Sequence, residues 1–144
     1  MAGSLTLRVI TPDRILLDAQ VGSVQIPGVD GWIGILPRHA HMVAALDVGP
    51  LRYVENGQSK GVFVSQGFAE VRQNTLRVVC EAGEMPAEID PQRAKEAEKR
   101  ARERLARGKG AAEPVDVLRA EASLRRALMR MRVLDLYSRE RVRS

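Results

Sequence analysis

Residues 51–64, LRYVENGQSKGVFV, indicate the kind of fold that this chain adopts. Two short runs of aliphatic and aromatic residues flank Asn56-Gly57, a dipeptide that suits the type I′ turn of a two-residue β-hairpin because both central positions of that turn need positive φ. Further runs with a period of two extend over residues 5–81, separated by Gly, Pro, Asn or Asp. Many short strands with tight turns predict an antiparallel β-sandwich or barrel of about ten strands.

The hydrophobic period changes after Pro86, where apolar residues begin to recur at helical spacing. Asp90 is a suitable N-cap, and Pro91 suits the first position of a helix. Two such helices, joined by a short connection, predict an antiparallel hairpin. We therefore expect an α+β chain with segregated domains, a β-sandwich over residues 1–86 and a helical hairpin over 87–144, with helices at about 91–107 and 114–136.

Charge divides the chain at the same place. The net charge is +5, but residues 1–90 hold seven Lys and Arg and ten Asp and Glu, whereas residues 91–144 hold sixteen and eight. The apolar positions of the first helix are mainly Ala, whose burial contributes much less than the roughly 1.5–3 kcal/mol of a buried Leu or Met. Docking of this basic hairpin is therefore expected to be weak, which makes it a candidate for two conformations.

Several function classes lack their usual residues. A nucleophile and a base at an interpretable spacing are absent, which argues against an enzyme. The arginines have no accompanying aromatic residues on which bases could stack, which argues against a nucleic-acid module. No stretch approaches 18 apolar residues, so attachment to a membrane is expected only through partners.

The stretch 31–37, GWIGILP, and the histidines that follow it are also expected to be structural. The stretch lacks the Gly-Lys-Ser/Thr of a phosphate loop, so it predicts a strand with a crowded backbone at its glycines. His39 and His41 are expected on one strand face, and a metal site would need at least one further donor. We expect no metal site, and we expect His39 to stabilise a turn by hydrogen bonding.

Residues 27–40, PGVDGWIGILPRHA, resemble the signature of the ε subunits of F-type ATP synthases, in which a glycine pair leads into Leu-Pro-x-His-Ala. Residues 10–12 (ITP), residues 63–71 (FVSQGFAEV) and the helical hairpin match the family in the same order, so the resemblance covers essentially the whole chain. The departures are His41 and Met42, where a Pro-Leu-like pair is common, and a basic tail at 137–144 without a clear counterpart. The signature positions are Gly31, Gly34, Leu36, Pro37 and His39.

This resemblance implies a non-catalytic subunit that couples and regulates. In this family the sandwich binds the γ subunit and the ring of c subunits, so that rotation driven by ion flow reaches γ. The hairpin folds on the sandwich or extends along γ into the catalytic α/β ring, where it inhibits ATP hydrolysis. A bacterial member lies at the cytoplasmic face of the cell membrane, held there by the complex. The implied partners are γ, the c-ring and the α and β subunits, with no nucleic acid.

In some bacterial members ATP binds to ε and stabilises the folded hairpin, and residues 89–94, IDPQRA, match the nucleotide motif of those members. The resemblance implies ATP, alone or with Mg, as a regulatory ligand and no required cofactor. Arg126 and Arg130 are four residues apart and are expected on one helix face, where their guanidinium groups could bind phosphate. The candidate ATP contacts are Ile89, Asp90, Arg93, Ala94, Arg100, Arg126 and Arg130.

A second interpretation of these residues remains open. Asp90-Pro91 is a good helix start without any ligand, and an arginine pair at this spacing arises easily by chance in a chain so rich in Arg. An arginine-rich helix would still serve inhibition, because the extended helix of this family meets acidic segments of the β subunit. Arg119, Arg125 and Arg132 are the candidates for those contacts, together with Arg126 and Arg130.

Overall fold

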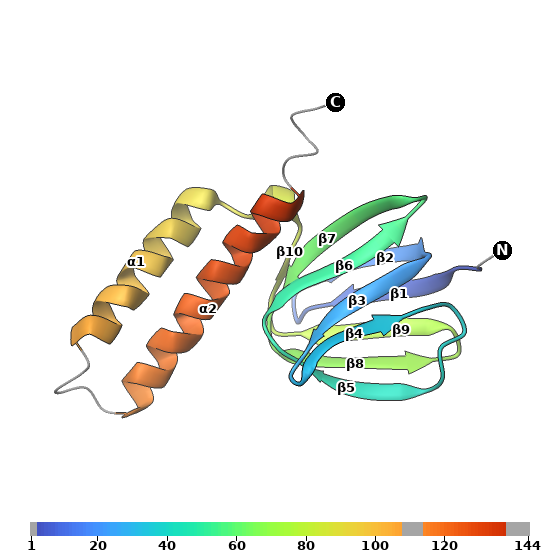
Figure 1. Ribbon diagram of the computed structural model, residues 1–144, viewed down its shortest axis with the longest axis horizontal. Coiled ribbons are helices and arrows are strands. Elements are labelled where there is room, and N and C mark those ends of the chain that lie inside the picture. Colours follow the sequence, from blue (N-terminus) through green and yellow to red (C-terminus); the bar gives the residue numbers. More distant parts are fainter. Residues whose placement is uncertain (1–2, 108–113, 138–144) are drawn as a thin grey trace.

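A computed structural model describes residues 3–107 and 114–137. Within these residues the chain forms a strand-rich N-terminal unit followed by two helices (Figure 1). The elements are β1 (Leu5–Ile10), β2 (Ile15–Val21), β3 (Ser23–Gly28), β4 (Gly31–Ile35), β5 (Met42–Leu46), β6 (Gly49–Glu55), β7 (Gln58–Val64), β8 (Gly67–Arg72), β9 (Thr75–Cys80), β10 (Gly83–Glu84), a 3₁₀ turn η1 (Pro86–Glu88), α1 (Pro91–Arg107) and α2 (Pro114–Tyr137).

The ten described strands form one curved sheet that folds over its own core. Their order is β10-β7-β6-β3-β5-β8-β9-β1-β2, with β4 paired to β3 beside this path. This confirms the predicted class, a sandwich or near-closed barrel followed by two packed helices. The pairing of β1 with β9 is parallel, whereas the other described pairs are antiparallel. The alternation of apolar and polar residues within a strand does not show whether its neighbour runs parallel or antiparallel. The sequence gives no other sign here, because β1 and β9 are far apart in the chain.

The predicted hairpin joins β6 to β7. Asn56 and Gly57 have φ of 52° and 78°, and Glu55 pairs with Gln58 across the turn. The expectation of a crowded backbone at Gly31 and Gly34 is wrong, because a Cβ added at either would meet no heavy atom within 4 Å. Gly31 instead has φ of 125°, a conformation that L side chains rarely adopt.

The histidines do not share a strand face, so that expectation is also wrong. His39 and His41 both precede β5, in the connection that begins after β4. Arg38 has φ of 63°, which turns the chain sharply at this point. The backbone N–H of His39 donates to the carbonyl of Leu36 (3.2 Å), and its Nδ1 lies 2.8 Å from the carbonyl oxygen of Ala40. His39 therefore helps to hold a turn.

Two clusters of buried side chains lie on opposite faces of β7. Val62 and Val64 belong to the main core of the sandwich, and Phe63 between them faces the other way because successive side chains of a strand alternate. Phe63 belongs to a second cluster with Val48, Ile89 and Val133, against which Met129, Leu134 and Tyr137 pack. This second cluster is where the C-terminal half of α2 docks on β6 and β7.

The two helices pack through small side chains. Ala94 and Ala101 of α1 and Ala120 and Ala127 of α2 are all buried. In Figure 1, α2 lies between α1 and the sandwich, so α1 is held mainly by α2. At the start of α1, Asp90 accepts hydrogen bonds from the backbone N–H groups of Gln92 (2.9 Å) and Arg93 (3.3 Å), which makes it the N-cap of this helix.

Candidate functional site

A pocket of about 320 Å³ opens where the hairpin meets the sandwich. This volume falls within the usual range of small-molecule sites. The pocket is formed jointly by the end of the sandwich, the linker and both helices. Its lining residues are Glu84, Glu88, Asp90, Arg93, Ala94, Ala97, Arg100 and Arg130.

The carboxylates of this pocket are already engaged in holding the linker. Asp90 caps α1, and Glu88 accepts from the backbone N–H of Met85 (2.9 Å) and pairs with Arg14 (2.7 Å). The Met85 N–H and the Arg14 guanidinium hold the pKa of Glu88 below its usual range, although partial burial opposes them. These contacts position the start of α1 relative to the sandwich.

The arginines of the pocket differ in their contacts. Arg130 donates from Nε to Glu84 Oε1 (2.6 Å), and its guanidinium carbon lies 4.5 Å from the centre of the Phe63 ring. Both contacts orient the guanidinium group. Arg93 and Arg100 are exposed, and neither forms an ion pair with the part of the chain that the structure describes. Two guanidinium groups without a described ion pair and one oriented group therefore line the same pocket as the carboxylates of Glu84, Glu88 and Asp90.

The structure separates the remaining ATP candidates from this pocket. Ile89 is 5% exposed and contributes to the second cluster, so its role is packing. Arg126 lines a smaller cavity of about 60 Å³ beside Ser65 and Glu81, and donates to Ser123 Oγ (3.1 Å). Arg126 and Arg130 are one turn apart but face different cavities.

Sequence reasoning missed three residues of the pocket. Glu84 comes from β10, Glu88 from η1, and Ala97 from one turn beyond Ala94. Glu88 accepts from the backbone N–H of Met85 as the glutamate of a capping box does, but Met85 lacks the side-chain acceptor that marks such a box in a sequence. For Glu84 no local signal exists. Among the described residues, no group of three or more His, Cys, Asp or Glu is placed to hold a metal ion.

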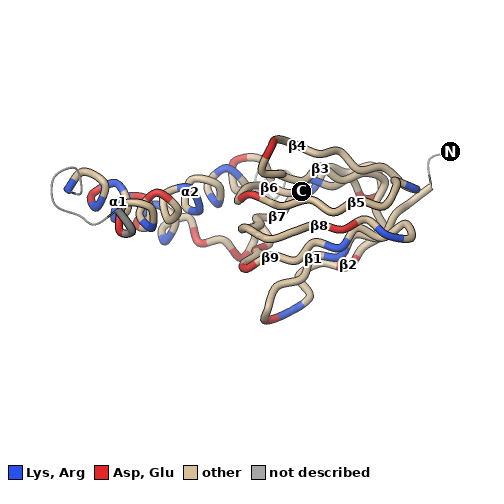
Figure 2. The backbone as a smooth tube through the Cα atoms, turned by 90° about the horizontal axis from the view of Figure 1, so that it is seen from below, with Lys and Arg blue, Asp and Glu red and all other residues tan. Residues whose placement is uncertain are grey.

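The candidates for inhibitory contacts also fall into two groups. Arg119 and Arg132 are exposed on α2. Arg125 instead donates to Asp47 Oδ2 of the sandwich (2.7 Å). Figure 2 shows Lys and Arg interspersed with Asp and Glu along both helices. Of the five candidate arginines, the folded hairpin therefore holds Arg125 and Arg130 in ion pairs with the sandwich.

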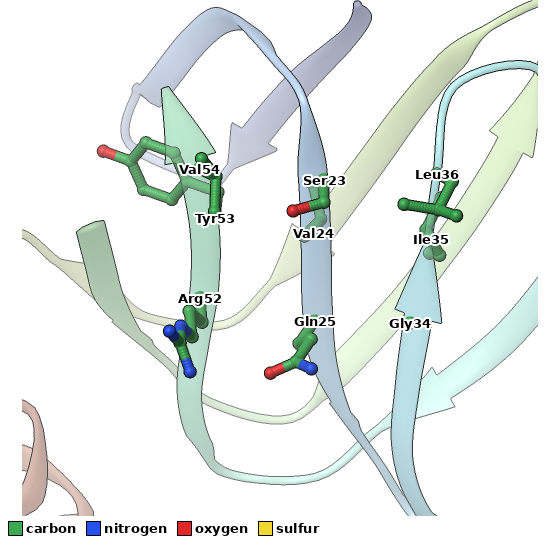
Figure 3. A pocket seen from close by; sticks show the side chains of 9 residues that line it. All are labelled: Ser23, Val24, Gln25, Gly34, Ile35, Leu36, Arg52, Tyr53 and Val54. Atoms are coloured by element: carbon green, nitrogen blue, oxygen red, sulfur yellow. The ribbon is translucent and has the colours of Figure 1, made fainter. Parts of the chain in front are cut away.

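The sandwich carries a separate, partly apolar outer surface. Val43 of β5 and Phe68 of β8 are 63% and 44% exposed, and they lie on one face because Phe68 pairs with Ala45, two residues from Val43. Trp32 on β4 and Leu36 just after it are also exposed. Leu36 borders a groove across β6, β3 and β4, which Gln25 and Arg52 also line (Figure 3).

Comparison with known families defines the class of this chain. A family model described as the β-sandwich domain of the ATP synthase delta/epsilon chain matches residues 4–86, and one described as the long α-helix domain of the same chain matches residues 87–135. The chain is therefore a delta/epsilon-type subunit of an ATP synthase. None of the helices described here is long and apolar enough to cross a membrane.

Individual relatives narrow this class. The ATP synthase epsilon chain of Nitratidesulfovibrio vulgaris (strain DP4) is 47% identical over 133 residues, which cover 92% of this chain and 97% of the relative. The epsilon chain of Symbiobacterium thermophilum is 46% identical over 129 residues, covering 89% and 91%. This chain belongs to the ATP synthase epsilon chain family, which confirms the resemblance found in its motifs. Epsilon chains are non-catalytic subunits of the central stalk.

Solved structures support the fold. A chain of the Euglena gracilis mitochondrial ATP synthase matches with a TM-score of 0.78 at 21% identity, covering 93% of this chain and 83% of that one. A chain from the Tetrahymena thermophila mitochondrial ATP synthase, in a structure described as central stalk and c-ring, matches with a TM-score of 0.58 at 12% identity, covering 90% and 95%. At these identities the likeness concerns the fold alone.

The Asp47–Arg125 pair predicts a pH-dependent contribution to hairpin docking. The Arg125 guanidinium and the Val48 N–H hold the pKa of Asp47 below its ordinary value of about 3.9, against the effect of partial burial. The contribution is present above that ordinary value and is lost as the pH falls through the lowered one. Because Arg125 is 55% exposed, Asp47→Asn should destabilise docking at neutral pH by only about 0.5 kcal/mol.

Urea unfolding followed by the helical circular dichroism signal measures this difference. The difference in unfolding free energy between the wild type and Asp47→Asn should disappear in strongly acidic solution. Asp18→Asn is the matched control, because it removes an exposed ion pair with Arg8 that joins two strands of the sandwich and does not involve the hairpin. This variant should leave the helical transition unchanged. Equal stability of Asp47→Asn and wild type at neutral pH would contradict the assignment.

Proposed function

We propose that this chain links the rotor ring to the γ subunit and regulates ATP hydrolysis through its helical hairpin, with ATP as the ligand that stabilises the folded hairpin. Its location is the cytoplasmic face of a bacterial cell membrane, where the complex holds it. The relatives named above support this assignment through their shared family. The observation that carries the regulatory part is the pocket built jointly by the sandwich, the linker and both helices.

The sandwich supplies the coupling part of this function. Exposed Val43 and Phe68 form an apolar patch on β5 and β8, and such patches on a stable domain commonly mark protein interfaces. Trp32 and Leu36 add further exposed apolar surface on and after β4. We assign these residues to docking on γ and the c-ring.

The hairpin supplies the inhibitory part. Arg119 and Arg132 are already exposed, and release of the hairpin from the sandwich would also free Arg125 from Asp47. The released α2 would thereby present a more basic surface to acidic segments of the β subunit. Inhibition therefore competes directly with docking on the sandwich.

ATP shifts this competition toward docking. Arg93 and Arg100 belong to α1, and Arg130 of α2 is held by Glu84 of the sandwich, so a phosphate chain bound by these arginines would tie the two helices together beside the sandwich. A ligand that binds only the folded arrangement stabilises it by mass action. Asp90 remains a candidate acceptor for the adenine amino group, through the oxygen that does not cap α1.

Calorimetric titration with MgATP tests the nucleotide site. Arg100→Gln should weaken binding at least about tenfold, on the order of 1.4 kcal/mol, because it removes a guanidinium with no other described partner. Arg104→Gln, an equally exposed change on the same helix outside the pocket, should leave the affinity unchanged. Absence of binding to the wild-type chain would eliminate the nucleotide site and leave the helix-start interpretation of residues 89–94.

The same titration separates the two arginines of α2. Since Arg126 lines a different cavity, Arg126→Gln should affect binding less than Arg130→Gln.

Reconstitution with a catalytic complex depleted of its ε subunit tests the inhibitory role. The full chain should lower ATP hydrolysis, and deletion of residues 90–144 should abolish this effect while assembly persists. The truncated chain should remain folded, because the main core of the sandwich contains no residue of the hairpin. Equal inhibition by the truncated chain would refute the role assigned to the hairpin.

Charge on the apolar patch tests the coupling surface. Phe68→Glu should reduce assembly with γ and the c-ring by tenfold or more, roughly the effect of losing a central apolar contact and burying a charge. Leu118→Glu, on an exposed apolar residue of α2 outside this patch, is the control that should assemble normally. Co-purification of the complex measures both, and normal assembly of Phe68→Glu would place the interface elsewhere on the sandwich.

A further inference from the structure

The last residue of α2 rests on a glycine of the sandwich. A Cβ added at Gly61 of β7 would lie 2.5 Å from Cζ and 2.6 Å from Cδ2 of Tyr137, and closer still to Cε2. These are ring atoms, and real Cβ atoms essentially never approach another heavy atom within 3.0 Å. The aromatic ring therefore occupies the space that any other residue at position 61 would fill.

The backbone at position 61 gives no other reason for a glycine. Gly61 is buried in the middle of β7 and is not among the described residues with positive φ. A glycine within a strand weakens it by roughly 0.5–1 kcal/mol relative to alanine, because its backbone loses more freedom on folding. What glycine contributes at this position is room for the Tyr137 ring.

The contact lies at one end of the docking surface. Gly61 and Phe63 are two residues apart on the same face of β7, so the Tyr137 ring continues the second cluster by one step along the strand. The N-terminal half of α2 leans away from the sandwich (Figure 1). The C-terminal end of α2 is therefore where docking is concentrated, and Tyr137 is the last described residue of that end.

We propose that Tyr137 seated on Gly61 is a latch that sets the balance between the docked and the released hairpin. Loss of the Gly61–Tyr137 contact shifts the equilibrium toward the released hairpin, even though the residues of the Phe63 cluster and of the Arg125 and Arg130 pairs are unchanged. The latch gives the first residue of the basic tail a conformational role. Its consequence for hydrolysis rests on the inhibitory function proposed above, but its effect on docking does not.

Two labels on the full-length chain measure docking directly. Asp13→Cys on the sandwich and Glu121→Cys on α2 are exposed positions for a fluorescent or spin-label pair. Cys80 is buried, and burial raises the pKa of its thiol to about 11, so it stays unlabelled. Gly61→Ala should raise the ratio of released to docked hairpin about tenfold, the usual scale for overpacking a contact.

The double variant distinguishes a latch from a local defect in β7. Tyr137→Ala alone should also increase release, because the ring no longer covers the strand. In the Tyr137→Ala background, Gly61→Ala should cause no further release, since the added methyl group then meets no ring. Additive effects, or an unchanged distance distribution in Gly61→Ala, would overturn the proposal.

Matched controls separate the ring contact from general effects. Gly34→Ala places a methyl group on a strand where no atom lies within 4 Å, and Leu136→Ala truncates the exposed neighbour of Tyr137; both should leave the distances unchanged. Release in either control would overturn the latch as a specific contact. Urea unfolding followed by the circular dichroism of the strands verifies that the sandwich stays folded in every variant.

The hydrolysis assay then tests the proposed function separately. If Gly61→Ala releases the hairpin in the isolated chain, it should inhibit an ε-depleted catalytic complex more strongly than the wild type. Release without stronger inhibition would support the proposed latch and refute the inhibitory role of the hairpin. Unchanged distances would refute the latch whatever the hydrolysis assay shows.

Discussion

The cluster that joins Val133 of α2 to Phe63 of β7 is the packing on which the position of the hairpin and the candidate pocket depend. Phe63 lies on β7 between Val62 and Val64, whose side chains build the main core on the opposite face of the strand. One strand thus carries both the interior of the sandwich and the surface that receives α2. Ile89 of the linker completes this second cluster, and Arg130 covers the Phe63 ring. Without this docking, the segments that line the candidate pocket would not meet.

The balance of forces at this interface favours a reversible association. The cluster buries only a few side chains, and the helix that lies outermost contributes alanines to its partner helix. The ion pairs across the interface are partly exposed, and pairs of this kind contribute little net free energy. They orient α2 on the sandwich more than they hold it there. A ligand or a competing partner of modest affinity would therefore suffice for the shift that we propose for the hairpin.

Local patterns predicted a large part of the architecture. Alternation and turn residues indicated the sandwich, Asn56-Gly57 marked the β6–β7 hairpin, and helical spacing after Pro86 indicated the packed helices. The errors concern residues whose surroundings come from elsewhere in the chain. Gly34 is open because no other segment covers it, and the histidines fall in a turn in which the Arg38 N–H donates to Asn74 Oδ1 of a distant loop. Strand direction between β1 and β9 could not be read for the same reason.

The sequence by itself determined the family, the strands and helices, the cap at Asp90 and most of the arginines considered for a ligand. Each of these follows from motifs or from residues close together in the chain. Only the tertiary structure decided that Glu84 joins Arg130, that Arg126 faces a different cavity, and that Tyr137 needs a glycine beneath it. Helical spacing places two arginines on one side of α2. Which of them meets a given pocket depends on how that helix is rotated and seated on β7, and this is set by packing against Phe63.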